Sequence, residues 1–84
     1  MDNIKKGEKI MKHTVWWLRP EAFKAKYIIV RDYGDGLLRW SGFSCDDYEM
    51  TKHCVDYGNT IPNLPYKKMM LETKDVIPAS DYGL

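Results

Sequence analysis

The clearest pattern of apolar and polar positions lies over residues 26–43, where two strand-like runs flank one glycine-rich turn. The runs on either side of Gly34-Asp35-Gly36 are rich in β-branched, aromatic and aliphatic residues, which is typical of strands. Asp-Gly between two such runs is among the strongest local signals for a β-hairpin. The sequence therefore predicts a hairpin over residues 26–43.

The position of the turn decides which residues of this hairpin face one another. A two-residue turn at Asp35-Gly36 pairs Asp32 with Arg39 and Arg31 with Trp40, and both pairings are chemically favourable. A turn one residue earlier sets Val30 against Arg39, so the first register is preferred. In that register both faces of the hairpin carry apolar side chains, which indicates that the hairpin lies inside a larger structure.

After Phe43 the apolar period changes to 3.6 residues, which predicts a helix over residues 45–57. Ser44 is the expected N-cap, and Gly58 with Asn59 is placed to end the helix. The half of the helix expected to face the sheet carries Tyr48, Met50, Thr51, Cys54, Val55 and Tyr57.

The remaining segments complete an α+β prediction. Residues 13–18 alternate as a strand, residues 20–26 suit a helical turn or a loop, and residues 66–74 suit a strand better than a short helix because prolines flank them. We expect one domain over residues 1–84, with a three- to four-stranded, mostly antiparallel sheet built around the hairpin and packed on the helix. A polar N-terminal lead (1–11) and a C-terminal tail (78–84) flank it.

Charge and cysteine content narrow the class of protein. The chain has 13 basic and 12 acidic residues. This nearly balanced charge indicates neither a basic surface that neutralises nucleic acid nor an acidic mimic of DNA. Two cysteines do not make a disulfide framework, and no apolar run is long enough to span a membrane. These features favour a cytoplasmic protein with reduced thiols and no membrane partner.

Zinc-type donors form the one constellation with ligand chemistry: Cys45, His53, Cys54 and, from the first strand, His13. Their spacing is unfavourable, because a continuous helix places Cys45 and Cys54 about 13 Å apart along its axis. A structural zinc site therefore requires the helix to begin later, with Cys45 folded back. Otherwise Cys54 packs in the core, Cys45 is half-buried, the histidines are surface groups and no cofactor is present.

No enzyme motif accompanies the carboxylates of the helix. Asp46, Asp47, Glu49 and Asp56 are explained by helix capping and solvation, and no set of serine, histidine and carboxylate occurs at a catalytic spacing. We expect no catalytic activity.

Aromatic content points to protein binding. The chain has three Trp, six Tyr and two Phe, and its first strand places Trp16 and Trp17 on opposite faces of a sheet that one helix can cover on only one side. The tails, a second copy in a homodimer, or another protein must cover the other face. The expected binding residues are Trp17, Arg31 and Trp40 on the sheet, with Glu49, His53 and Asp56 as a polar rim on the helix.

Nucleic-acid binding is the alternative function. Lys24, Lys26, Arg31 and Arg39 are interleaved with Tyr27, Tyr33 and Trp40, as a basic face with stacking aromatics requires. However, the preferred register already gives both arginines hairpin partners, and the sequence carries no signature motif of single-strand binding.

In size, in its lysine-, tyrosine- and methionine-rich composition and in its lack of enzyme motifs, the chain resembles small inhibitors of host defence encoded by phages and other mobile elements, including anti-CRISPR proteins. The resemblance implies stoichiometric binding, in the host cytoplasm, to a nuclease or another nucleoprotein and a block on its access to nucleic acid. A few such inhibitors hold a structural metal. The resemblance assigns no role to any single residue.

Overall fold

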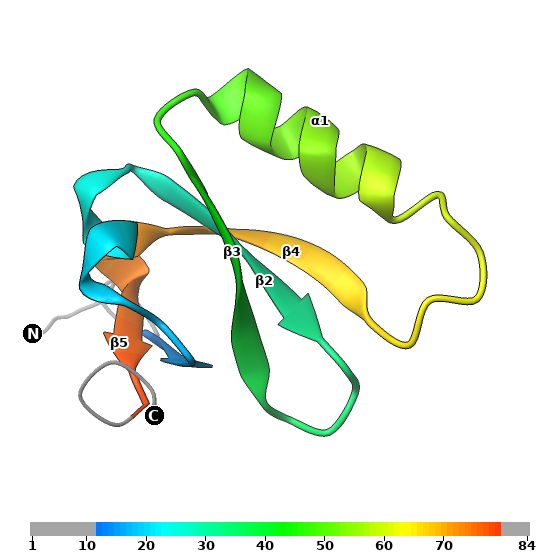
Figure 1. The fold of residues 1–84 in the computed structure, drawn as a ribbon, viewed down its shortest axis with the longest axis horizontal. Helices are drawn as coiled ribbons and strands as arrows, with labels where there is room; N and C mark the ends of the chain where they lie inside the picture. Colours follow the sequence, from blue (N-terminus) through cyan, green and yellow to red (C-terminus); the bar gives the residue numbers. More distant parts are fainter. Residues whose placement is uncertain (1–11, 80–84) are drawn as a thin grey trace, which may run out of the picture.

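The computed structural model describes residues 12–79, and Figure 1 shows the arrangement of their elements. In chain order these are β1 (His13–Trp16), the 3-10 helix η1 (Pro20–Lys24), β2 (Tyr27–Asp32), β3 (Leu38–Cys45), α1 (Tyr48–Gly58), β4 (Lys67–Glu72), the 3-10 helix η2 (Thr73–Asp75) and β5 (Val76–Pro78). The strands form one mixed sheet in the order β4-β2-β3-β1-β5. Within it β2 is antiparallel to β3 and β4, and β1 is parallel to β3 and β5.

The α+β class is confirmed, but the prediction of three or four mostly antiparallel strands is wrong. The sheet has five strands, and β1 is parallel to its neighbours because the chain passes through η1 and β2 before reaching β3. β5 has three residues, too few to show an alternation, and its Pro78 suits an edge strand. The predicted C-terminal tail thus begins inside β5. The predicted lead (1–11) and residues 80–84 lie outside the described residues.

The hairpin is present, but its register lies one residue away from both predicted alternatives. Leu38 is opposite Asp32, and Arg39 is opposite Arg31. The preferred pairings of Asp32 with Arg39 and of Arg31 with Trp40 are therefore wrong. Instead of facing a carboxylate and an indole, the two arginines face each other.

The loop of the hairpin explains this shift. Its backbone is capped by the chain's own carboxylates, because the N–H of Gly34 donates to Asp32 at 2.9 Å and the N–H of Leu37 donates to Asp35 at 3.1 Å. Gly34 and Gly36 have φ angles of 82° and 87°, which glycine adopts without a steric penalty. The two aspartates therefore support a loop longer than the predicted two-residue turn.

A second irregularity interrupts the pairing of β2 with β3. The register shifts between Ile29 and Val30 because β3 accommodates Ser41-Gly42 as extra residues. The Ser41 hydroxyl donates to the carbonyl of Ile29 at 2.7 Å, and Gly42 has a φ of 94°. Beyond this bulge Phe43 lies opposite Ile29, so the two side chains share one face of the sheet.

The helix begins later than predicted. Asp47 is its N-cap, and its carboxylate accepts the N–H groups of Glu49 and Met50 at 2.9 and 3.2 Å. Ser44 and Cys45, predicted as the N-cap and first residue, belong to β3 instead. Ser44 pairs with Ile28 of β2, and Cys45 pairs with Tyr27. This pairing keeps both residues in an extended conformation.

Of the helix side chains predicted to face the sheet, only some do. Thr51 and Val55 are buried, as is Gly58 at the end of the helix. Met50 and Tyr57, which lie to one side of this narrow stripe, are exposed at 54% and 65%. The helix therefore contacts the sheet along one edge of its apolar half.

The main core lies on the face of the sheet away from α1. Ile28 and Val30 of β2 pack there with Leu18 and Ala22, while Ile29 between them points to the helix side. The segment around η1 therefore covers the face of the sheet away from α1. The sequence analysis predicted that the tails, a second copy or another protein would cover that face. On the other face, α1 contacts β4, β2 and β3 (Figure 1).

The N-cap can be tested by two matched substitutions. Asp47→Ala removes the acceptor of two helix N–H groups and should lower the free energy of unfolding by about 1 kcal/mol. Ser44→Ala should lower it by less than about 0.5 kcal/mol, as for a residue without a capping role. Urea denaturation followed by circular dichroism measures both, and a larger loss for Ser44→Ala would contradict the observed helix start.

Candidate functional site

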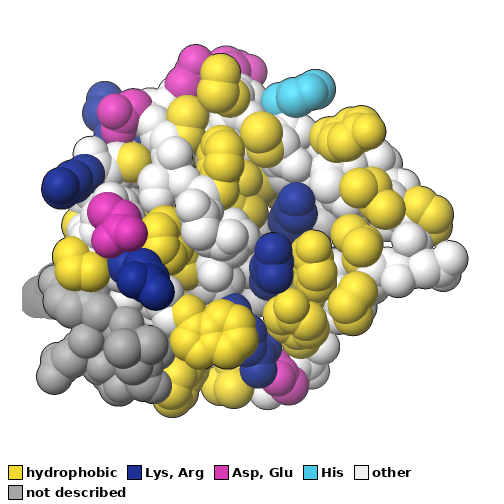
Figure 2. Space-filling view, in the orientation of Figure 1, with side chains coloured by type: hydrophobic (Ala, Val, Ile, Leu, Met, Phe, Trp, Pro, Cys, Tyr) yellow, Lys and Arg dark blue, Asp and Glu magenta, His cyan; other side chains and the backbone are white. Residues whose placement is uncertain are grey.

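Three cationic side chains share one row across the helix side of the sheet. Arg31 of β2 is opposite Arg39 on β3 and opposite Lys68 on β4. Directly opposite residues in antiparallel strands place their Cβ atoms about 5 Å apart, and like charges there repel. Figure 2 shows Lys and Arg side chains lying between hydrophobic ones on the face below the helix. The row therefore needs compensating charge.

Asp35 compensates Arg39. Two carboxylate oxygens of Asp35 accept from the guanidinium at 3.0 and 3.4 Å. The hydrogen bond from Arg39 lowers the pKa of Asp35 below its usual range, and the N–H of Leu37 adds to this. The same hydrogen bond raises the pKa of Arg39.

Lys68 lies against the end of the helix. Its side chain packs so closely on Gly58 that a methyl group added there would sit 2.7 Å from Cδ and 2.9 Å from Nζ. The last turn of a helix carries partial negative charge on its free carbonyls. The fold therefore places the ammonium group of Lys68 where the helix dipole favours it.

Arg31 has no such compensation. Its Nε is buried without a hydrogen-bond partner, and among the described residues its guanidinium forms no ion pair. It lies instead over the ring of Tyr66, with Cζ 4.9 Å from the ring centroid. The charge is held by a cation–π contact, which leaves its hydrogen-bonding capacity unused.

Aromatic rings link the two arginines into one surface. Arg39 lies over the ring of Tyr33 at 4.8 Å and near that of Trp17 at 5.8 Å, and the rings of Tyr33 and Tyr66 are 5.2 Å apart. We call Trp17, Arg31, Tyr33, Arg39 and Tyr66 the arginine–aromatic surface. It joins the end of β1, the hairpin loop and the segment before β4, which are distant in sequence.

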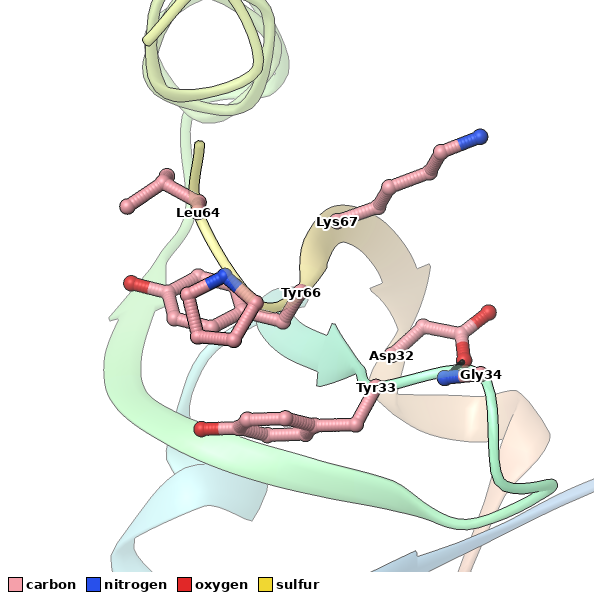
Figure 3. Close-up of a pocket in the computed structure, with 7 residues that line it drawn as sticks. Asp32, Tyr33, Gly34, Leu64, Tyr66 and Lys67 are labelled. Atoms are coloured by element: carbon pink, nitrogen blue, oxygen red, sulfur yellow. Dashed lines mark hydrogen bonds between the residues drawn. The ribbon is translucent and has the colours of Figure 1, made fainter. Parts of the chain in front are cut away.

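Among the described residues, three hollows lie along this surface. A cavity of about 330 Å³ is lined by Tyr33 and Tyr66 with Leu64 and Pro65, and its other lining residues are Asp32, Gly34 and Lys67. Figure 3 shows the two tyrosine rings one above the other, with their hydroxyl groups directed to the same side and the Lys67 side chain directed away. A second cavity of about 380 Å³ adjoins it at Tyr66. A third, of about 130 Å³, lies between Trp17 and Arg39.

Trp17 is exposed and conformationally strained. It is 54% exposed, and its φ of 64° lies in the left-handed region, which is unfavourable for a bulky residue. Strained backbone of this kind concentrates at functional sites. The fold therefore holds an indole in solvent at a conformational cost.

The structure brings together only part of the predicted binding set. Trp17 and Arg31 belong to the arginine–aromatic surface, whereas Trp40 packs against the main core and donates its indole N–H to the carbonyl of Phe43 at 3.1 Å. Tyr66 was outside the predicted set, because it follows two prolines in a segment whose position depends on long-range pairing. Arg39 and Tyr33 are also outside the predicted binding set, although both belong to the basic and aromatic face of the nucleic-acid alternative.

The predicted helix rim is exposed, and the contacts of its residues lie within the helix and its N-cap. Asp56 pairs with Lys52 at 2.9 Å, a hydrogen bond that raises the pKa of the lysine. His53 stacks on Tyr57 at 6.4 Å, and Glu49 donates its backbone N–H to the Asp47 cap. These contacts are typical of a solvated helix face.

The zinc-type donors are dispersed. Cys45 ends β3, where its thiol lies 3.9 Å from the sulfur of Met50, while His53 and Cys54 are on α1 and His13 is on β1. Over residues 12–79 no three His, Cys, Asp or Glu side chains are grouped so that they could hold a metal ion. The two cysteines are free thiols.

Comparison of the chain with protein-family models, with curated proteins and with solved structures finds no match. Within the described part of the chain, no helix has the length and apolar character needed to cross a membrane. The arginine–aromatic surface is therefore the feature of the structure from which a function can be proposed.

The strain at Trp17 predicts an unusual order of stabilities. Both Trp17→Ala and Trp17→Gly remove the indole, but only glycine relieves the left-handed conformation, so the glycine variant should be the more stable by about 1 kcal/mol. Urea denaturation of the two variants measures the difference. An alanine variant as stable as the glycine variant would show that the backbone at residue 17 is not strained.

The Asp35–Arg39 pair predicts a dependence of stability on pH. Because the folded-state pKa of Asp35 is lowered, its stabilising effect is present above the unfolded-state pKa and is lost as pH falls through the folded-state value. The stability difference between the wild type and Asp35→Asn should therefore shrink below about pH 4. Thermal unfolding of both proteins across this range tests it, and a difference that persists in acid would contradict the ion pair.

Proposed function

We propose that this protein acts by binding another protein stoichiometrically through the arginine–aromatic surface, as an inhibitor or adaptor without catalytic activity. The observation that supports the proposal most directly is the composition of that surface. Trp, Tyr and Arg are the residue types that most often dominate binding energy at protein interfaces, and here all three types are in mutual contact and partly exposed.

The preorganisation of these side chains supports the same function. Each tyrosine ring contacts both a guanidinium and the other tyrosine, so the rings lose little conformational freedom when a partner binds. The adjoining hollows offer places for partner side chains. The strained conformation of Trp17 fits a residue retained for binding at some loss of stability.

The resemblance to phage-encoded inhibitors suggests the class of partner. In this proposal the partner is a host protein or nucleoprotein of a defence system, and binding blocks a nuclease or its access to nucleic acid. The site of action is then the host cytoplasm.

Binding of single-stranded nucleic acid is the second candidate, and the row of Lys68, Arg31 and Arg39 favours it. Against it, the tyrosine rings on which bases would stack are already in contact with guanidiniums, and Asp35 neutralises one arginine. A nucleic-acid complex would weaken steeply with added salt, whereas a protein complex built on aromatic contacts would not.

Affinity capture from host lysate, with and without nuclease treatment, tests the proposed function. A protein partner should be recovered at the same level in both conditions and identified by mass spectrometry. With that partner purified, Tyr33→Ala should weaken binding by about tenfold or more, as for an interface anchor. Tyr57→Ala removes an equally large exposed ring from the helix and serves as the matched control, with little change expected.

Three results would contradict the proposal. Recovery only when nucleic acid is intact would favour the second candidate. Equal affinities of the wild type and a folded Tyr33→Ala variant for the purified partner would place the binding surface elsewhere. If the only species recovered is the protein itself, self-association replaces binding to another protein.

A further inference from the structure

One of the three cationic side chains on the helix side of the sheet lacks a compensating negative charge within residues 12–79. Of the three cations in the row, Arg39 is paired with Asp35 and Lys68 lies against the helix end. Arg31 lies between them and forms no ion pair among the described residues. Arg31 is therefore the one cation of this row whose charge is not compensated by a described residue or by the helix end.

The guanidinium of Arg31 is placed to bind an anion through its two terminal nitrogens. Its Nε is enclosed without a partner, which leaves the two terminal nitrogens as the donors available to a ligand. The contact with the Tyr66 ring fixes the plane of the group. A planar guanidinium with two parallel N–H donors matches the two oxygens of a carboxylate, and such charge-assisted pairs are stronger than neutral hydrogen bonds.

An apolar site lies next to this donor pair. Tyr66, whose ring contacts Arg31, also lines the open hollow of about 330 Å³ beside Tyr33, Leu64 and Pro65. Asp32, Gly34 and Lys67 complete the lining of this hollow. A cavity of this size and lining suits an apolar side chain. The two features together define a site for an acidic residue beside an apolar one.

We propose that the protein partner inserts a Glu or Asp carboxylate against the terminal nitrogens of Arg31, with a neighbouring apolar side chain in the cavity beside Tyr66. This inference rests on the proposed function and specifies the chemistry that the partner presents. Binding then supplies the missing charge of the cationic row.

The local charges favour a single carboxylate over a phosphate backbone. Asp35 occupies Arg39, so a chain of phosphates following the row would meet the carboxylate of Asp35. The net charge of the whole protein is only +1. One side-chain carboxylate needs Arg31 alone and does not have to approach Asp35.

Nuclear magnetic resonance with short peptides tests the inference on the wild-type protein. The probes are a peptide containing Leu-Glu-Leu, a matched Leu-Gln-Leu peptide and a short oligothymidylate. The glutamate peptide should shift the side-chain N–H signals of Arg31 saturably and bind about tenfold more tightly than the glutamine peptide, as expected when a charged hydrogen-bond acceptor is replaced by a neutral one. This comparison requires no variant of the protein.

Variants then assign the effect to Arg31. Arg31→Lys keeps the charge but loses the planar donor pair, so the preference for glutamate should fall severalfold. Arg19→Lys makes the same change at an exposed arginine outside the surface and should leave the preference unchanged. The backbone spectrum of each variant shows that it is folded.

Equal affinities for the two peptides, or no saturable shift at Arg31, would overturn the inference. A larger shift at Arg31 with oligothymidylate than with the glutamate peptide would also overturn it in favour of a phosphate ligand. These results are separable from failure of the proposed function. If Tyr33→Ala weakens binding of the purified partner while the peptides show no glutamate preference, protein binding stands and the carboxylate site does not.

Discussion

Repulsion within the row of Lys68, Arg31 and Arg39 is the constraint around which this surface is built. The row exists because β2 pairs in register with strands on both sides. Asp35 then folds back from the hairpin loop onto Arg39, and the helix brings its C-terminal end to Lys68. The rings of Tyr66 and Tyr33 lie against the guanidinium groups of Arg31 and Arg39, respectively. Loop, helix and sheet are thus connected through the charges they compensate.

The distribution of the core explains why this face is free for binding. Leu18 and Ala22 cover the opposite face of the sheet, where the main cluster of buried side chains lies. On the helix side, α1 buries only a narrow stripe around Thr51 and Val55. The chain therefore stabilises itself mainly on one face and leaves arginines and aromatic rings on the other. The buried, unsatisfied Nε of Arg31 and the left-handed Trp17 are unfavourable for folding, and both lie on this second face.

The sequence predicts the features that local patterns control. The hairpin, the helix, its Gly58-Asn59 end and a strand within residues 66–74, observed as Lys67–Glu72, all follow from residue spacing and turn chemistry. The register does not, because Asp32 and Asp35 cap the loop backbone and extend it beyond the expected turn. Ser44 resembles an N-cap, yet pairing with β2 keeps it in a strand.

Trp17 and Arg31 could be selected as binding residues by their residue types. Their contacts with Arg39 and Tyr66 depend on the order of the strands in the sheet, which the hydrophobic periodicity of the sequence does not determine.

Site-specific photo-crosslinking in host cells tests most directly whether the arginine–aromatic surface meets a protein. A photoreactive phenylalanine analogue replaces Tyr33 in one variant and Tyr57 in another, and the crosslinked products are separated after nuclease treatment. The account predicts one discrete protein adduct from position 33 and none from position 57. An adduct from position 57 alone, or crosslinks from position 33 to nucleic acid alone, would contradict it.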